Sequence, residues 1–125
     1  MLHGACKATG DGVTTVKSYE DVPVNSPQAL MDAVAQGPVS IAVDAASVGF
    51  QLYLGGIVSH LCGTNLDHGV LAVGYGTENN KDYWLVKNSW GSMWGEKGYI
   101  RILREMDKEG PGMCGIQMSA SYPIF

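Results

Sequence analysis

Two strand-like runs lie on either side of a short stretch of turn-forming residues, and this pairing limits the fold more than any other feature. The first run extends from His68 to Tyr75 and the second from Tyr83 to Trp90, and both are rich in Val, Leu and aromatic residues. Residues 76–82 between them are Gly, Thr, Asn and charged residues, which favour loops. We therefore predict an antiparallel hairpin with a loop that is longer than a tight turn.

The predicted hairpin brings two polar side chains close together. With a turn centred near residue 78 or 79, His68 lies across from the 88–90 end of the partner strand. Positions 68 and 88 have the same parity, so an even register places His68 and Asn88 on one face of the sheet. A register slip of one residue would place them on opposite faces, and the sequence leaves the register open.

The remaining segments complete an α+β pattern. Asn25 or Ser26 can cap a helix that has Pro27 in its first turn, and Gln28 can answer a cap at Asn25. Leu30, Ala33 and Val34 share one face of this helix, which Gly37-Pro38 ends. Further strands are predicted over 13–19, 41–43 and 98–103, a final extended segment over 121–125, and a single helical turn over 50–54. We predict an antiparallel β-barrel-like lobe with one main N-terminal helix.

Composition narrows the function classes. Hydrophobic residues make up 46% of the 125 residues, enough for one domain with a core. Eight Lys and Arg are scattered among 12 Asp and Glu, so we expect no nucleic-acid partner, and no apolar run is long enough for a membrane span. The start of the chain lacks the pattern of a signal peptide. We expect a flexible segment over 1–12 and a single lobe over 13–125.

The chemistry suggested by His68 and Asn88 is proton transfer. A neutral imidazole can accept a proton from a thiol when a partner on its other ring nitrogen holds the tautomer and the ring plane. The side-chain oxygen of an Asn can be that partner without adding charge, which suits a thiolate–imidazolium pair. Trp90 follows two residues later and could shield the contact from water. A buried histidine and a turn asparagine are the structural alternatives.

Long motifs in this chain resemble the papain/cathepsin L family of cysteine proteases. They cover nearly the whole sequence and keep their order and spacing. The motifs are Gly37-Pro38-Val39-Ser40, Cys62-Gly63, the run from Leu66 to Gly76, the run from Tyr83 to Gly91, the run from Trp94 to Arg101, Cys114-Gly115-Ile116 and Ser121-Tyr122-Pro123.

The resemblance implies a role for individual residues. His68 matches the general base of the family, Asn88 the residue that orients it and Trp90 the aromatic cover, with Trp94 beside it on the primed side of the cleft. The pocket for the substrate residue that precedes P1 matches Ala42, Leu66, Gly69 and Ser119. Asp67, Trp90 and Trp94 join this substrate-binding set. The charge of Asp67 could act on His68, or Asp67 could be a solvated turn residue.

The resemblance also implies a second lobe. The family nucleophile lies in a Gln…Cys-Gly-Ser-Cys-Trp stretch, and this sequence contains none. The chain is therefore similar to the right-hand, β-barrel lobe alone, half of the papain-like fold. The expected partners are a peptide or protein substrate, a complementary Cys-bearing left lobe, and a prosegment or inhibitor. For the parent enzyme we expect a lysosomal, vacuolar or secreted location, and no cofactor or metal.

Three cysteines leave at least one thiol outside any intrachain disulfide. Cys62 and Cys114 could form a disulfide, join His60 and His68 around zinc without the usual ligand spacing, or leave Cys62 as a nucleophile. The resemblance favours the disulfide. It matches Cys6 to a cysteine that pairs with the other lobe, so here Cys6 would be free or form an intermolecular bridge.

Two further functions remain open beside the endopeptidase. The lobe could be a non-catalytic module that binds peptides, prosegments or inhibitors through half a cleft. It could also self-associate through an exposed interlobe face, because large apolar patches drive association. We expect the isolated chain to be inactive as a peptidase, since a base without a nucleophile cannot cleave an amide bond.

Overall fold

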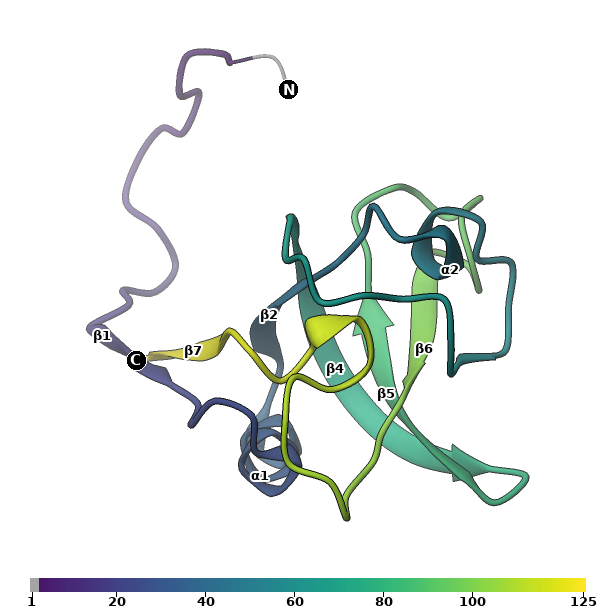
Figure 1. The fold of residues 1–125 in the computed structure, drawn as a ribbon. Coiled ribbons are helices and arrows are strands. Elements are labelled where there is room, and N and C mark those ends of the chain that lie inside the picture. The colour runs from purple at the N-terminus through teal and green to yellow at the C-terminus, as the bar shows by residue number, and fades with distance from the viewer. Residues whose placement is uncertain (1–2) are drawn as a thin grey trace.

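The computed structural model describes residues 3–125. Residues 1–2 belong to the predicted flexible segment 1–12 and to the start for which no signal peptide is expected, and this part of both predictions lies outside the described residues. Residues 3–17 form neither a helix nor a strand. They run away from the folded part as an extended thread that reaches the sheet at β1, Ser18–Asp21 (Figure 1).

Seven strands form one open sheet in the order β1-β7-β2-β4-β5-β6-β3. All neighbours pair antiparallel except β3 and β6, which are parallel. One helix and two short turns accompany this sheet, and the predicted α+β class is confirmed. The remaining elements are α1 (Pro27–Gln36), β2 (Val39–Val43), α2 (Val48–Gln51), β3 (Ile57–Val58), β4 (His68–Glu78), β5 (Lys81–Lys87), β6 (Tyr99–Leu103), η1 (Met113–Gly115) and β7 (Ala120–Ile124).

Local sequence signals set the ends of α1. The Ser26 hydroxyl oxygen accepts the N–H of Ala29 at 3.1 Å, and Pro27 occupies the first helical position, where its missing N–H costs nothing. Ser26 is therefore the cap, and the predicted answer of Gln28 to Asn25 is wrong. The Gln28 amide instead donates to Asp32 one turn later. The Gly37 N–H donates to the Val34 carbonyl, and the helix ends there as predicted.

The first predicted strand is shorter than its Val- and Thr-rich sequence suggested. It was expected over 13–19, but β1 begins at Ser18 because pairing with β7 begins there. Val13 is fully exposed, with no neighbouring strand to pack on. A segment with high intrinsic β-propensity forms a strand only where a partner strand is available to pair with it. The prediction over 41–43 lies within β2, and those over 98–103 and 121–125 match β6 and β7 except that Gly98 and Phe125 lie outside the strands.

The hairpin turn is tighter than predicted. The strands β4 and β5 continue to Glu78 and Lys81, so the loop consists of Asn79 and Asn80 alone instead of residues 76–82. Both asparagines have positive φ, 51° and 63°. This is the backbone that a two-residue type I′ turn needs, and Asn tolerates it better than most residues.

The core lies between the sheet and the segments that cover it. The predicted turn over 50–54 is α2, which begins two residues earlier and buries Phe50 completely. No helix among residues 3–125 has the length and apolar character needed to cross a bilayer. The largest fully buried side chains come from α1, α2, β5, β6 and the residue after η1: Trp84, Phe50, Leu30, Ile100, Ile102 and Ile116.

A disulfide joins Cys62 and Cys114, which are 52 residues apart. It ties the loop before β4 to η1, and Cys114 is fully buried. Cys6 is exposed and lies outside this bond.

Loss of this disulfide should cost a large part of the stability. Replacing both Cys62 and Cys114 with Ala should lower the free energy of unfolding by about 4 kcal/mol, because the unfolded chain regains the entropy of a 52-residue loop. Urea unfolding followed by tryptophan fluorescence measures this loss. The matched control is Cys6→Ala, which should stay within about 0.5 kcal/mol of wild type. A loss below about 1 kcal/mol in the double variant would contradict the expectation.

Candidate active site

His68 and Asn88 meet at the open end of the β4–β5 hairpin. His68 begins β4, and Asn88 directly follows β5. The His68 Nε2 and the Asn88 Oδ1 are 2.7 Å apart, a hydrogen-bond distance. Asn88 is buried, and its own N–H donates to the Gly98 carbonyl at 3.0 Å. The amide is thus held from its backbone side, while its oxygen points to the imidazole.

The backbone N–H of Ser89 shows which tautomer the imidazole of His68 adopts. The Ser89 N–H donates to the Asn88 Oδ1 at 2.7 Å. Since a backbone N–H can only donate, the atom that it contacts must be the amide oxygen and not the nitrogen. The same oxygen accepts from His68 Nε2, so the neutral ring carries its proton on Nε2. The lone pair on Nδ1 is then available to accept a proton.

A one-residue bulge brings the two side chains to the same face. Near the turn, Glu78 pairs with Lys81, and this register continued without interruption would place Asn88 opposite Leu71. Asn88 would then point away from the face of His68. Val73 is the extra residue of a bulge between Ala72 and Gly74, and beyond it Ala72 pairs with Val86. The shifted register restores equal parity for residues 68 and 88.

Aromatic rings cover the His–Asn contact. The Trp90 ring stacks on His68 with the centroids 5.1 Å apart and the planes 28° apart. Phe50 meets Trp90 edge-on at 5.4 Å and lies 5.1 Å from Trp94. Edge-on and offset contacts of this kind contribute beyond simple area burial. The imidazole therefore has an apolar wall on one face.

An ionic clamp supports this aromatic wall from behind. The Trp94 ring lies 5.5 Å from Tyr53, whose hydroxyl donates to the Gly56 carbonyl and accepts the Arg101 N–H. Burial raises the pKa of Tyr53 to about 12. The Arg101 guanidinium hydrogen-bonds both oxygens of Glu96 and holds the pKa of this carboxyl below its usual value. Arg101 also pairs with Glu78.

The predicted pocket residues come from several segments of the chain: β2, the loop before β4, the start of β4 and the segment before β7. Ala42 pairs with Gly69 across β2 and β4, and the Ala42 N–H donates to the Ser119 carbonyl at 3.1 Å. These three therefore lie together. Leu66 and Asp67 line a separate open hollow of about 370 Å³. The Asp67 carboxylate accepts the Ala45 N–H at 2.8 Å, so it joins two segments of the backbone.

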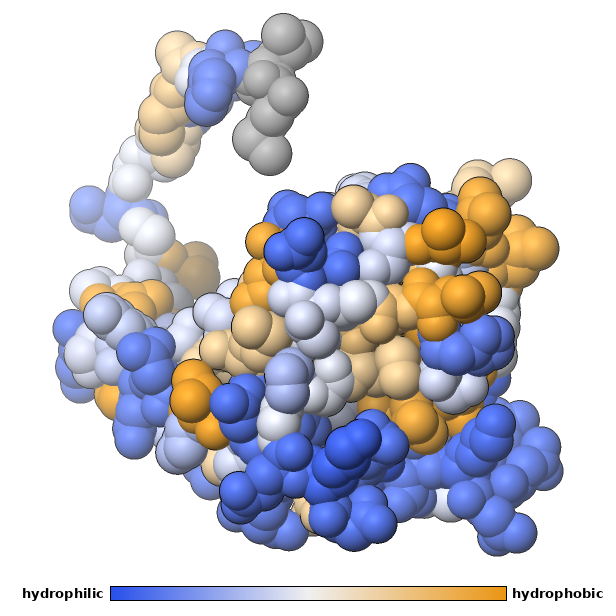
Figure 2. Space-filling model, viewed as in Figure 1, coloured by the Kyte–Doolittle hydropathy of each residue, from blue (hydrophilic) through white to orange (hydrophobic). Residues whose placement is uncertain are grey.

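Several large apolar side chains near the aromatic residues in the sequence are exposed. Leu52 and Leu54, which follow α2, are 74% and 89% exposed, and Met93 is 98% exposed. Figure 2 shows hydrophobic residues gathered over the part of the molecule where α2 lies. Trp90 itself is partly exposed. Exposed apolar residues therefore lie close in the sequence to Phe50, which contacts both tryptophans, and between Trp90 and Trp94.

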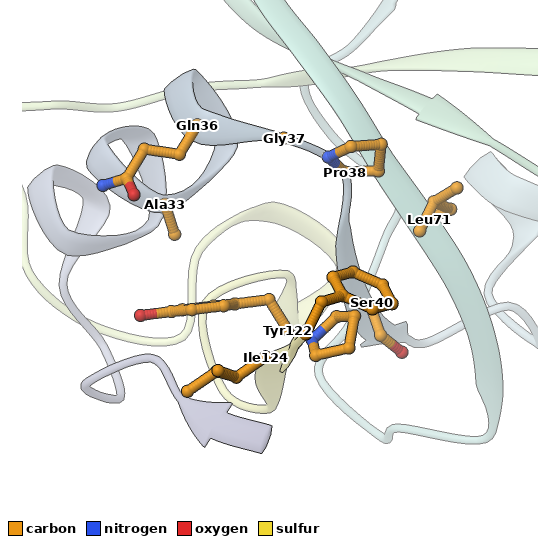
Figure 3. A pocket seen from close by; sticks show the side chains of 10 residues that line it. Ala33, Gln36, Gly37, Pro38, Ser40, Leu71, Tyr122 and Ile124 are labelled. Atoms are coloured by element: carbon orange, nitrogen blue, oxygen red, sulfur yellow. The ribbon is translucent and has the colours of Figure 1, made fainter. Parts of the chain in front are cut away.

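Another cavity lies away from His68, between α1 and the C-terminal strand. It measures about 620 Å³ and is lined mainly by apolar atoms. Ala33 and Gln36 come from α1, Leu71 from β4, and Tyr122 and Ile124 from β7 (Figure 3). None of the candidate site residues lines it.

Several residues of the site were missed by the sequence analysis. Phe50 fell in an ambiguous segment, and Ser89 carries no signal in its side chain because only its backbone acts. Glu96 and Arg101 have the spacing of neighbours on a strand hairpin, but nothing in the sequence connects them to Tyr53. Among residues 3–125, no group of three or more His, Cys, Asp or Glu residues is arranged to hold a metal ion.

Comparisons with known proteins identify the family. The family sequence model for the papain family of cysteine proteases matches residues 2–124. The chain belongs to the papain family of cysteine proteases. It is similar to a probable cysteine protease RD21B from Arabidopsis thaliana, with 59% identity over 90% of this chain and 24% of that protein. It is also 54% identical, over 98% of this chain and 34% of the relative, to the KDEL-tailed cysteine endopeptidase CEP2 of the same plant.

A solved family structure has the same fold as this chain. Bromelain from Ananas comosus, in complex with the E64 inhibitor, superimposes with a TM-score of 0.86 and 43% identity. The match covers 92% of this chain and 53% of bromelain. The chain therefore spans about half of this family structure, and less of the curated relatives.

Removing the bulge should separate the His–Asn pair. Deletion of Val73 makes the register of the turn continuous, so His68 and Asn88 should fall on opposite faces. The hydrogen-bonded Nε2 proton of His68 should then disappear from the ¹H–¹⁵N NMR spectrum. The control is Val73→Ala, which keeps the residue count and should keep this signal. A deletion variant that retains the Nε2 signal would refute the role of the bulge.

The Glu96–Arg101 clamp should make stability depend on pH. Because the folded state lowers the pKa of Glu96, its contribution is complete above the usual value of 4.5 and is lost as the pH falls through the lowered value. Glu96→Gln should therefore destabilise the chain more at pH 7 than at pH 3, as measured by urea unfolding. Glu78→Gln, which removes a more exposed partner of Arg101, should have a smaller effect. Equal losses at both pH values would contradict this mechanism.

Proposed function

We propose that this chain is the His- and Asn-bearing lobe of a papain-type cysteine endopeptidase, which hydrolyses peptide bonds together with a Cys-bearing lobe. The observation that carries the proposal is the 2.7 Å contact between His68 Nε2 and Asn88 Oδ1, with Ser89 fixing the identity of the oxygen. Family membership supports it. Since the chain spans about half of a solved family structure, the activity belongs to the whole protein.

In the proposed reaction, His68 Nδ1 takes the proton of a cysteine thiol that the complementary lobe supplies. The thiolate sulfur attacks the carbonyl carbon of the substrate, and the imidazolium returns the proton to the leaving amine as the C–N bond breaks. Water then hydrolyses the thioester, with His68 accepting the proton of the water and delivering it to the departing sulfur.

Asn88 and Trp90 prepare the imidazole for these steps. Asn88 holds the ring by accepting from Nε2–H in both the neutral and the charged form, and it adds no charge of its own. The stacked Trp90 ring keeps water from that side of the contact. Both effects favour an imidazole whose plane and tautomer are set before the substrate arrives.

The substrate would lie against the small and apolar residues beside His68. Ala42, Leu66, Gly69 and Ser119 would form the pocket for the residue that precedes P1, with Asp67 at its rim. Trp90 and Trp94 would contact the leaving side of the peptide, where the exposed Met93 lies between them in the chain. Such walls favour hydrophobic side chains. For the whole enzyme we propose a lysosomal, vacuolar or secreted location.

The complementary lobe would cover the outer face of β2, β4 and β5. An open hollow of about 350 Å³ there is lined by residues that include Ser40, Gly69 and Ser89. Uncovered, this face could bind a prosegment, an inhibitor or a second copy of the chain. A binding module without catalysis is therefore the second candidate, supported by the hollows that Gly69 and Leu66 line.

Complementation tests the proposal. The chain alone should not hydrolyse a peptide substrate in a thiol-dependent manner, and activity should appear when it is refolded with the Cys-bearing half of a papain-family protease. In that complex His68→Ala should lower the rate by about 10²–10⁴-fold, the usual contribution of a general base. Ser59→Ala, in the loop directly after β3, is the control.

Two outcomes would overturn parts of this assignment. Turnover by the pure chain that His68→Ala abolishes would contradict the need for a second lobe. A correctly assembled complex without activity would leave the binding module as the function of the chain.

A further inference from the structure

Asp44 is a buried carboxylate that the proposed reaction does not use. It directly follows β2, and only 6% of its surface is exposed. Its Oδ1 accepts the Ser47 N–H at 3.2 Å, and its Oδ2 accepts the Asn65 N–H at 3.1 Å. A buried carboxylate is stable only where such donors replace water. Here the two donors come from segments 18 residues apart, so the side chain joins the start of α2 to the loop that precedes β4.

The loop over residues 62–67 depends on such contacts for its position, because it contains no helix or strand. The Gly63 N–H donates to the Ser47 hydroxyl at 2.8 Å, and Asn65 is held by Asp44. The Asp67 N–H donates to the Val43 carbonyl at 3.1 Å. Contacts from residues 43–47 therefore hold the loop backbone at every second residue, at positions 63, 65 and 67.

Leu66 lies between two of these anchored residues. Asn65 is bound on one side of it and Asp67 on the other. Behind Leu66, the backbone of Gly115 approaches so closely that a Cβ there would come within 2.7 Å of Leu66 Cδ2. The side chain is thus confined both by its neighbours in the chain and by η1. A shift of Asn65 would move Leu66 along this surface.

Gly63 provides independent evidence for the same arrangement. A Cβ on Gly63 would lie 2.7 Å from the Asp44 Oδ2 and 3.5 Å from the Ser47 hydroxyl. The loop backbone can approach the carboxylate this closely only because residue 63 has no side chain. The Asp44 N–H also donates to the Cys114 carbonyl at 2.9 Å, so the carboxylate is itself held beside the disulfide.

From these contacts we infer that Asp44 is a positioning residue, which fixes the Cys62–Asp67 loop and thereby sets the place of the Leu66 wall in the peptide-binding surface. The inference rests on the proposed function for the role of Leu66 as a wall. It assigns to Asp44 an effect on side-chain selectivity and none on the His68–Asn88 contact, because His68 is held by its pairing with Val43 in the β2–β4 ladder.

Two variants of the full chain test this inference from opposite sides of the contact. Asp44→Asn removes one acceptor and places an amide donor against a backbone donor. Gly63→Ala keeps the carboxylate and pushes the loop away from it. In both, hydrogen exchange at the Asn65 amide should accelerate by about tenfold or more relative to the Ala72 and Val86 amides of the sheet, as expected when a hydrogen bond to a charged acceptor is lost. The matched control is Asp107→Asn, at an exposed position, which should leave the exchange unchanged.

The same variants are examined for selectivity by NMR titration. Acetyl-Gly-Leu-Gly-amide should shift the Leu66 methyl signals of the wild type, and acetyl-Gly-Gly-Gly-amide should not. In both variants the leucine-specific shift should fall several-fold, while the His68 Nε2 proton signal stays in place. A purely structural role for Asp44 predicts instead that all core amides exchange faster together and that the His68 signal is lost with them.

Each outcome bears on one claim. Unchanged Asn65 exchange in Gly63→Ala would overturn the positioning role, even if Asp44→Asn failed to fold. Faster Asn65 exchange with an unchanged leucine-specific shift would overturn the link from the loop to selectivity. If the wild type itself shows no shift at Leu66 with the leucine peptide, the proposed wall is wrong, whereas the exchange data still decide whether Asp44 positions the loop.

Discussion

The hydrogen bond between His68 and Asn88 depends on the number of residues in the β4–β5 hairpin. Two backbone features determine whether residues 68 and 88 lie on the same face of the sheet, and their effects are opposite. The Asn79-Asn80 turn sets a register in which residues 68 and 88 would face apart, and the extra residue at Val73 reverses this. Neither feature touches the imidazole. The geometry of the pair is therefore a property of the ladder, and the side chains need only the correct identities once the ladder has formed.

The residues around His68 and Asn88 form a series of contacts that leads outward from the imidazole. Trp90 covers the imidazole, Phe50 and Trp94 hold Trp90, and Tyr53 holds Trp94. The Glu96–Arg101 ion pair closes the sequence at the outer end. Exposed ion pairs contribute little by themselves. Here the partly buried guanidinium contacts both carboxylate oxygens of Glu96, and Glu96 also accepts the Gly56 N–H, so the ion pair fixes the Gly56 and Tyr53 region in place.

Features that depend on the identity of residues could be predicted from the sequence. Features that depend on backbone conformation could not. The end of the helix at Gly37 and the α+β class follow from local sequence signals and periodicity, whereas the sequence left the cap open between Asn25 and Ser26. The equal parity of residues 68 and 88 made the contact between His68 and Asn88 plausible. The bulge that produces the required register could not be predicted, because the Gly- and Val-rich sequence around Val73 carries no signal for it. The roles of Ser89 and Asp44 also could not be predicted, because both depend on backbone groups. One acts through its backbone N–H, and the other contacts backbone groups that are distant in the sequence.

The distribution of these contacts separates two tasks within a single lobe. His68, the proposed base, is held by the β2–β4–β5 ladder of backbone hydrogen bonds. The loop that carries Leu66, the proposed wall, is held by side-chain acceptors, chiefly those of Asp44, Ser47 and Asp67. A substitution in the loop can therefore move the wall without disturbing the base. In an enzyme assembled in this way, selectivity for the substrate side chain could change while the proton-transfer geometry remains constant, because the two depend on different sets of hydrogen bonds.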